Sequence, residues 1–149
     1  MKPITRDMQL GALIWGIGDP FLLAFCNVRA YGISHFIGNF IFFFFSTGPL
    51  AILAGIAAGY FAGQWKQKYS NTLQILVSAA GVSAALNIFV EWASIGFLYS
   101  FGAVANHLSI LGWIQAFQPI AIALLPLAVI TGVLCGIMTA LVVLKIKVK

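Results

Sequence analysis

The chain has 149 residues, of which 62% are hydrophobic and only 7% are charged, and its formal net charge is +5. A water-soluble domain carries about a quarter charged residues, so this composition excludes a soluble globular protein and indicates that lipid is the main solvent. The lysines lie at the ends of apolar segments, where they orient a membrane protein, so the expected partner is the lipid bilayer and not nucleic acid.

Long apolar segments separated by short polar turns predict an all-α integral membrane protein with four transmembrane helices. At ~20 apolar residues per span, the chain has room for about four spans in a single membrane domain, residues 1–149. The expected spans are about 10–28, 33–63 with a kink at Pro49, 72–102, and 108–144 with kinks at Pro119 and Pro126. Proline kinks a helix because it has no N–H to donate.

The basic residues predict the orientation of these spans. With four spans, both termini and the polar connection Gln64–Asn71 share one side, and that side holds every lysine and arginine except Arg29. The positive-inside rule then places both termini in the cytoplasm. We therefore expect a multi-pass protein of a prokaryotic cytoplasmic (inner) membrane.

Glycines at four-residue spacing form a stripe in the second segment, and a similar stripe follows Pro126 in the fourth. Such a glycine zipper lets another backbone approach closely. The expected packing residues are Gly55, Gly59, Gly63, Gly132 and Gly136. We expect the second and fourth segments to pack through these stripes, within the chain or in a homo-oligomer. The matching prolines and glycines suggest an internal repeat of two helical hairpins, against the alternative of chance matches between apolar segments.

The sequence Gly18-Asp19-Pro20 interrupts the first span. Aspartate is a preferred N-cap and proline a preferred first helical residue. The pattern therefore predicts two half-helices that meet near the middle of the membrane, as in the broken helices with which many transporters bind ions or substrates. The structural alternative is that Asp19 caps a kink and faces a neighbouring helix.

Further polar residues are expected at the outer half of the membrane. Asn87 and Glu91 share one helix face, as do His35 and Asn39. The candidate pathway for a substrate or ion consists of Asp19, Arg29, His35, Asn39, Asn87, Glu91 and His107. The alternative interpretation is an ion pair between Arg29 and Glu91, with interfacial histidines that bond to lipid or water.

No catalytic motif is present: there is no phosphate-binding loop, nucleophile elbow, HExxH or CxxC. An enzyme is therefore the less expected class, and no catalytic residue is assigned. A haem held by His35 and His107, or a metal held by these two with Glu91, has no other support, so no cofactor and no metal are expected. The run Phe42–Phe45 is interpreted as lipid-facing bulk, with a quinone or pigment site as the alternative.

The broken first span and the membrane-embedded acids favour a small transport or channel protein that moves a small solute or ion through a polar pathway. The alternative is a non-enzymatic subunit of a larger membrane complex, because almost nothing of the chain would lie outside the membrane. The expected partners are copies of the same chain or other membrane subunits.

Overall fold

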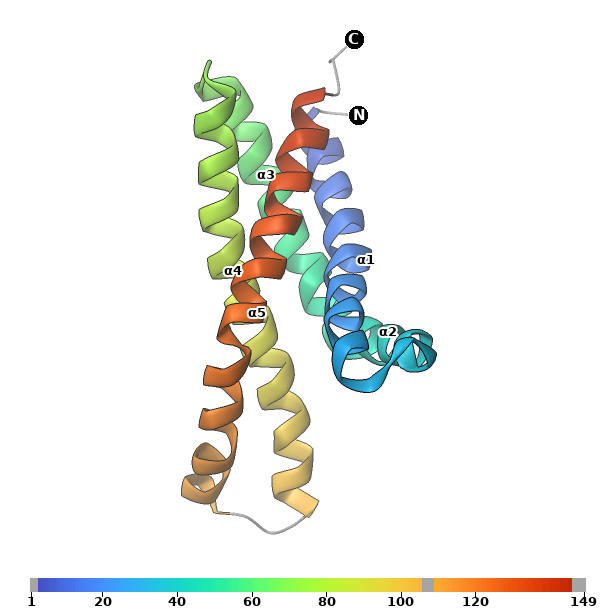
Figure 1. Ribbon diagram of the computed structural model, residues 1–149. Coiled ribbons are helices and arrows are strands. Elements are labelled where there is room, and N and C mark those ends of the chain that lie inside the picture. Colours follow the sequence, from blue (N-terminus) through green and yellow to red (C-terminus); the bar gives the residue numbers. More distant parts are fainter. Residues whose placement is uncertain (1–2, 106–108, 146–149) are drawn as a thin grey trace.

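The computed structural model describes residues 3–105 and 109–145, and nearly all of them are helical. The elements are α1 (Pro3–Tyr31), a 3-10 turn η1 (Ile33–His35), α2 (Phe36–Ser46), α3 (Gly48–Lys68), α4 (Thr72–Ala105) and α5 (Ile110–Lys145). Helices α1, α3, α4 and α5 run alongside one another, and the start of α1, the end of α5 and the α3–α4 connection lie at one end of the bundle (Figure 1). We call this the termini end.

Three helical stretches are long and apolar enough to cross a membrane: Thr5–Val28, Thr72–Leu98 and Ile110–Lys145. A fourth candidate is the bent pair Ile33–Ser46 and Gly48–Lys68, whose halves meet at 66°. The all-helical class predicted from composition is confirmed, with three to four candidate spans. Whether the bent pair crosses the membrane or re-enters from one side decides between these two counts.

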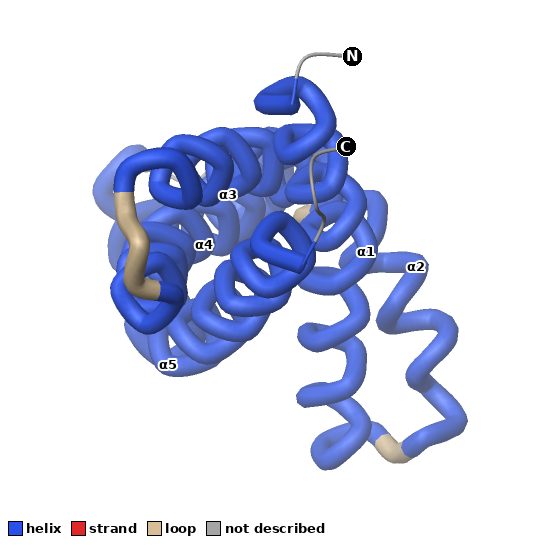
Figure 2. Tube along the Cα trace, turned by 90° about the horizontal axis from the view of Figure 1, so that it is seen from above, coloured by secondary structure: helices blue, strands red, loops and turns tan. Residues whose placement is uncertain are grey.

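The bend between α2 and α3 lies at Thr47, two residues before Pro49. Pro49 is in the first turn of α3, where a missing N–H removes no helical hydrogen bond. The carbonyl oxygen of Phe43, near the end of α2, accepts from the backbone N–H of Thr47 at 2.8 Å and from the Thr47 hydroxyl at 3.0 Å. Seen along the bundle, α2 lies at its edge, beside the end of α1 (Figure 2). In contrast, α5 continues as one helix through Pro119 and Pro126.

Helix α1 is uninterrupted, so the predicted pair of half-helices at Gly18-Asp19-Pro20 is wrong. Pro20 lies inside the helix and leaves the carbonyl of Gly16 without its usual partner. The start of α3 packs at this point, since a Cβ built on Gly48 would lie 3.9 Å from the Gly16 oxygen and 4.0 Å from Pro20 Cγ. The α2–α3 bend thus packs over the turn of α1 that Pro20 weakens, and neighbouring helices commonly allow a proline to stay within a membrane helix in this way.

The glycine stripes lie at two different helix contacts. A Cβ on Gly55 would overlap the carbonyl oxygen of Gly11, and one on Gly59 would overlap that of Asp7, so α3 meets α1 backbone to backbone. Gly63 lies against the side chain of Asp7 on the same face. All buried residues of α3 are glycine or alanine, which permits this close approach.

Gly132 and Gly136 of α5 pack instead against α4, where a Cβ would meet Ser83 and its neighbours. The expected contact between the two glycine stripes is therefore wrong within the chain. The stripe of α5 thus faces α4, the helix directly before it, whereas the stripe of α3 faces α1, the long helix before the bent pair. Whether the two pairs descend from one duplicated hairpin stays a prediction.

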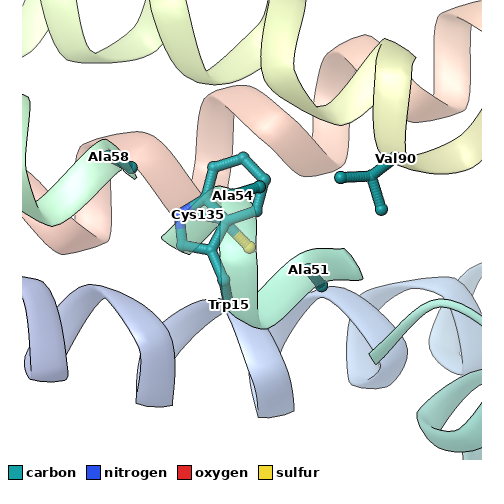
Figure 3. Close-up of a cluster of buried hydrophobic side chains, with 6 residues drawn as sticks. All are labelled: Trp15, Ala51, Ala54, Ala58, Val90 and Cys135. Atoms are coloured by element: carbon teal, nitrogen blue, oxygen red, sulfur yellow. The ribbon is translucent and has the colours of Figure 1, made fainter. Parts of the chain in front are cut away.

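Apolar side chains fill the interior of the bundle toward the termini end. Trp15 is fully buried and extends from α1 toward α5, where it packs with Ala54 and Cys135 (Figure 3). A second cluster of Ile75, Ala79 and Ala140 lies further toward that end, with Trp65 and Tyr69 packed against it. These two apolar clusters fill much of this half of the bundle, which also contains the buried side chains of Ser83 and Thr139.

Candidate functional site

Asp19 of α1 is completely buried, and its carboxyl group interacts with polar side chains from the other parts of the bundle. Asn87 and Glu91 come from α4, Thr131 comes from α5, and Thr47 is the residue at the α2–α3 bend. Each of these side chains is at most 5% exposed. We call Asp19, Thr47, Asn87, Glu91 and Thr131 the polar layer.

Asn87 connects α4 to α5 within the polar layer. Its amide nitrogen donates to the hydroxyl oxygen of Thr131 at 2.6 Å and to the carbonyl oxygen of Ala128 at 3.0 Å. The Thr131 hydroxyl in turn donates to the carbonyl of Leu127, 3.1 Å away and one turn earlier in α5. The amide N–H groups of Asn87 and the hydroxyl of Thr131 therefore donate to atoms of α5. They do not donate to the carboxyl groups of Asp19 and Glu91.

Three of the four carboxyl oxygens of the two acids in the polar layer lack a hydrogen-bond partner. Both carboxyl oxygens of Asp19 and Oε1 of Glu91 are buried and accept no hydrogen bond. No basic side chain is among the groups that interact with either acid in the described part of the chain. An unpaired buried carboxylate is costly, and two that face each other cannot both be charged without a counter-ion. The pair Asp19–Glu91 therefore requires a proton or a cation to be neutralised.

A cavity of about 270 Å³ adjoins the polar layer on the side away from the termini end. Its walls come from α1, α2, α4 and α5, and it begins at Glu91. Its polar lining residues are Asn27, Ser46, Thr47, Glu91 and Ser94, and the rest of the lining is apolar. The hydroxyl oxygens of Ser46 and Ser94 are buried without a hydrogen-bond partner, as is Oε1 of Glu91. The cavity is thus apolar with a few unsatisfied oxygens at its inner end.

The structure brings together three of the seven residues expected to form the polar pathway, namely Asp19, Asn87 and Glu91. His35 is exposed on η1, where its ring lies 3.2 Å from the hydroxyl of Ser34. Asn39 lies on α2 outside the cavity lining, with a buried and unpartnered amide nitrogen. The side chain of Arg29 and the whole of His107 lie outside the described residues.

The histidine-based metal and haem hypotheses gain no support. Across residues 3–105 and 109–145, no three His, Cys, Asp or Glu side chains lie where they could hold one metal ion.

Sequence reasoning missed Thr47 and Thr131 in the polar layer, and Ser46 and Ser94 at the cavity. A threonine or serine in a membrane helix usually bonds to the carbonyl one turn earlier, as Thr131 does, so its presence carries little signal. Thr47 offered one clue, because it directly precedes Gly48 and Pro49, where a bend was expected. No family model, no curated protein and no solved structure matches the chain.

Proposed function

We propose that this chain is a small membrane transport protein in which Asp19 and Glu91 together bind and pass on a proton or a small cation. The observation that carries this proposal is the pair of buried carboxyl groups from α1 and α4, of whose four oxygens three have no hydrogen-bond partner. Ionisable residues inside membrane helices are costly, and they commonly mark ion or proton pathways.

The surroundings of the pair support binding and release. The described ionisable groups that interact with Asp19 are Glu91 and the thiol of Cys135 on α5, and no basic side chain is among them. The amide nitrogen of Asn87 donates to Thr131 and to the carbonyl of Ala128, and not to the acids. The acids therefore have free acceptor positions, which suit an exchangeable proton or cation better than a permanent structural ion pair.

Access to the pair supports a carrier rather than an open channel. The cavity reaches Glu91 from one side, while Trp15 and the apolar clusters lie between the pair and the termini end. Transport would then require a rearrangement that closes the cavity and opens the other half. Thr47 is both the bend residue and a member of the polar layer, so a change in the 66° bend is the simplest route to that rearrangement.

Orientation follows from the basic residues under this proposal. With both termini in the cytoplasm, the cavity lies in the outer half of the membrane, on the external side of the acid pair. The substrate or driving ion would then first meet Glu91 from the external side and reach Asp19 next.

A flux assay in liposomes tests the proposal. Purified protein is reconstituted into liposomes that enclose a pH-sensitive dye. A potassium gradient with valinomycin sets the membrane potential. The dye response then reports proton entry, measured with and without a sodium gradient. Asp19→Asn and Glu91→Gln are expected to reduce flux to the level of protein-free liposomes. Equal flux in wild type and Asp19→Asn would remove Asp19 from the mechanism.

Asp7→Asn is the matched control for these variants. Asp7 is the remaining acid of the chain, and it lies near the termini end against Gly63, away from the polar layer. The same acid-to-amide change there is expected to leave flux unchanged. Monodisperse elution and unchanged helix content establish that each variant is folded.

An accessory subunit of a membrane complex is the second candidate, and the far ends of α4 and α5 favour it. With 34 and 36 residues, these helices are about 51 and 54 Å long, well beyond the ~30 Å hydrocarbon core. Their far ends project past the other helices (Figure 1) and expose apolar residues such as Ile110 and Leu111. Gentle solubilisation and mass measurement distinguish the candidates, because a stable hetero-complex supports the subunit and a homo-oligomer supports the transporter.

A further inference from the structure

We propose that the cavity beside Glu91 binds a small apolar organic ammonium ion, with the charge at Glu91 and the apolar part between α2, α4 and α5. This inference rests on the proposed transport function, since it names the class of substrate that the same site would take.

The charge of the cavity lining favours a cation as the ligand. Among the residues that the structure describes, Glu91 is the only acidic or basic one that lines the cavity, and it is 5% exposed with Oε1 unpartnered. An anion would meet an uncompensated carboxyl group, whereas an ammonium ion would satisfy it in surroundings where water competes poorly.

Two phenylalanines support the same choice. Phe42 and Phe43 line the cavity, and their ring centroids lie 5.4 Å apart in an edge-to-face arrangement. Aromatic faces attract ammonium groups and also pack against apolar chains. The run of phenylalanines, interpreted from sequence as lipid-facing bulk, would thus also supply part of a binding surface.

The remaining polar atoms favour a ligand that donates hydrogen bonds. Ser46 and Ser94 both line the cavity, and their hydroxyl oxygens have no partner. A primary ammonium group has three N–H donors, which can be shared among Glu91 and these two hydroxyls. A lipid acyl chain would fill the apolar part but leave all three groups unsatisfied.

The volume limits the ligand to a small molecule. About 270 Å³ is near the lower end of known ligand pockets. Leucine and isoleucine side chains, including Leu98, Leu124 and Ile120, form the apolar walls. A single aromatic ring on a short chain that ends in an amine matches this size and lining.

Three probes with the same phenyl-alkyl body but different charge test the inference: 4-phenylbutylamine, 4-phenyl-1-butanol and 4-phenylbutyrate. Binding is measured by calorimetry on the full chain in lipid nanodiscs, with empty nanodiscs as the blank for partition into lipid. We expect wild type to bind the amine at least about tenfold more tightly than the alcohol, and the carboxylate more weakly than the alcohol. Equal affinity for amine and alcohol would overturn the inference and indicate an apolar pocket such as one for a lipid chain.

Two variants connect the binding to this site. Glu91→Gln is expected to remove the preference for amine over alcohol, and Leu98→Trp is expected to abolish amine binding by filling the cavity while leaving Glu91 in place. Asp7→Asn is expected to bind all probes as wild type does. An unchanged amine preference in folded Glu91→Gln, or unchanged binding in folded Leu98→Trp, would place the amine elsewhere and overturn the inference.

Different experimental results would overturn the transport proposal and the amine-binding proposal. Selective amine binding without acid-dependent flux would keep the site and remove transport. Flux that depends on Asp19 and Glu91, without amine binding, would keep transport and overturn the assignment of this substrate class.

Discussion

The side-chain amide of Asn87 donates a hydrogen bond to the hydroxyl of Thr131, 2.6 Å away, and thereby joins α4 to α5 beside the buried Asp19. This contact is one of few polar links between the long helices of the described chain. It fixes the position of Glu91, one turn from Asn87, relative to α5. We therefore expect the contact to matter both for stability and for the geometry of the acids.

Thr131→Val tests this link because it removes the hydroxyl and keeps the shape of the side chain. We expect a loss of about 0.5–1.7 kcal/mol of unfolding free energy, the range measured for hydrogen bonds between membrane helices. The measurement is unfolding of the purified protein by SDS in mixed micelles, followed by circular dichroism.

Thr139→Val is the control for that substitution. Both threonines are 1% exposed on α5, and both donate to the carbonyl one turn earlier, but Thr139 has no hydrogen bond to another helix among the described residues. Its replacement is expected to cost less than about 0.5 kcal/mol. Equal losses for the two variants would mean that the Asn87–Thr131 contact contributes nothing specific.

Close packing of α1 on α3 leads to a second prediction. A Cβ on Gly59 would overlap the main-chain carbonyl of Asp7, and a backbone cannot move aside as a flexible side chain can. Gly59→Ala is therefore expected to destabilise the protein by about 1–3 kcal/mol in the same unfolding assay. Gly81→Ala, at an exposed helical position with nothing within 4 Å, is expected to cost nothing and to add up to ~1 kcal/mol from helix propensity. A harmless Gly59→Ala would show that the helices are further apart than described.

The helices of this chain could be predicted from sequence because apolar runs and terminal lysines follow directly from the physics of a bilayer. The continuity of the helix through Pro20 could not be predicted from the local sequence, because it depends on a segment distant in the chain. Asp19-Pro20 carries the local signals of a helix start, yet α1 continues because the start of α3 at Gly48 packs against the weakened turn. The helix that packs against each glycine stripe could not be predicted from the sequence either. A stripe of glycines indicates that another helix approaches closely, but it does not indicate which helix.

The candidate site was predicted in part for similar reasons. Asp19, Asn87 and Glu91 were recognisable because acids and amides in a span are costly. His35 was grouped with these residues only because of its expected depth in the membrane, and in the structure it is exposed on a turn. Thr47 and Thr131 were missed because a hydroxyl in a helix can satisfy itself on its own backbone, so only tertiary contacts reveal its second role.

The side of the membrane reached by each loop is a third prediction, and it decides between three and four spans. In a variant without Cys26 and Cys135, a cysteine at Ser70 is expected to react with a membrane-impermeant maleimide only after the cells are permeabilised. A cysteine at the exposed His35 is expected to react in intact cells. Labelling of the Ser70 position from outside would mean that the bent pair α2–α3 re-enters the membrane without crossing it.

The most direct test of the central claim, that Asp19 and Glu91 act as one site, is the liposome flux of Asp19→Asn, Glu91→Gln and the double variant measured side by side. If the two carboxyls share one proton or cation, each single variant loses the flux and the double variant loses nothing further, because groups that act as a unit are non-additive. The account is contradicted if either folded single variant transports like wild type, or if each loses only part of the flux and the losses combine independently in the double variant.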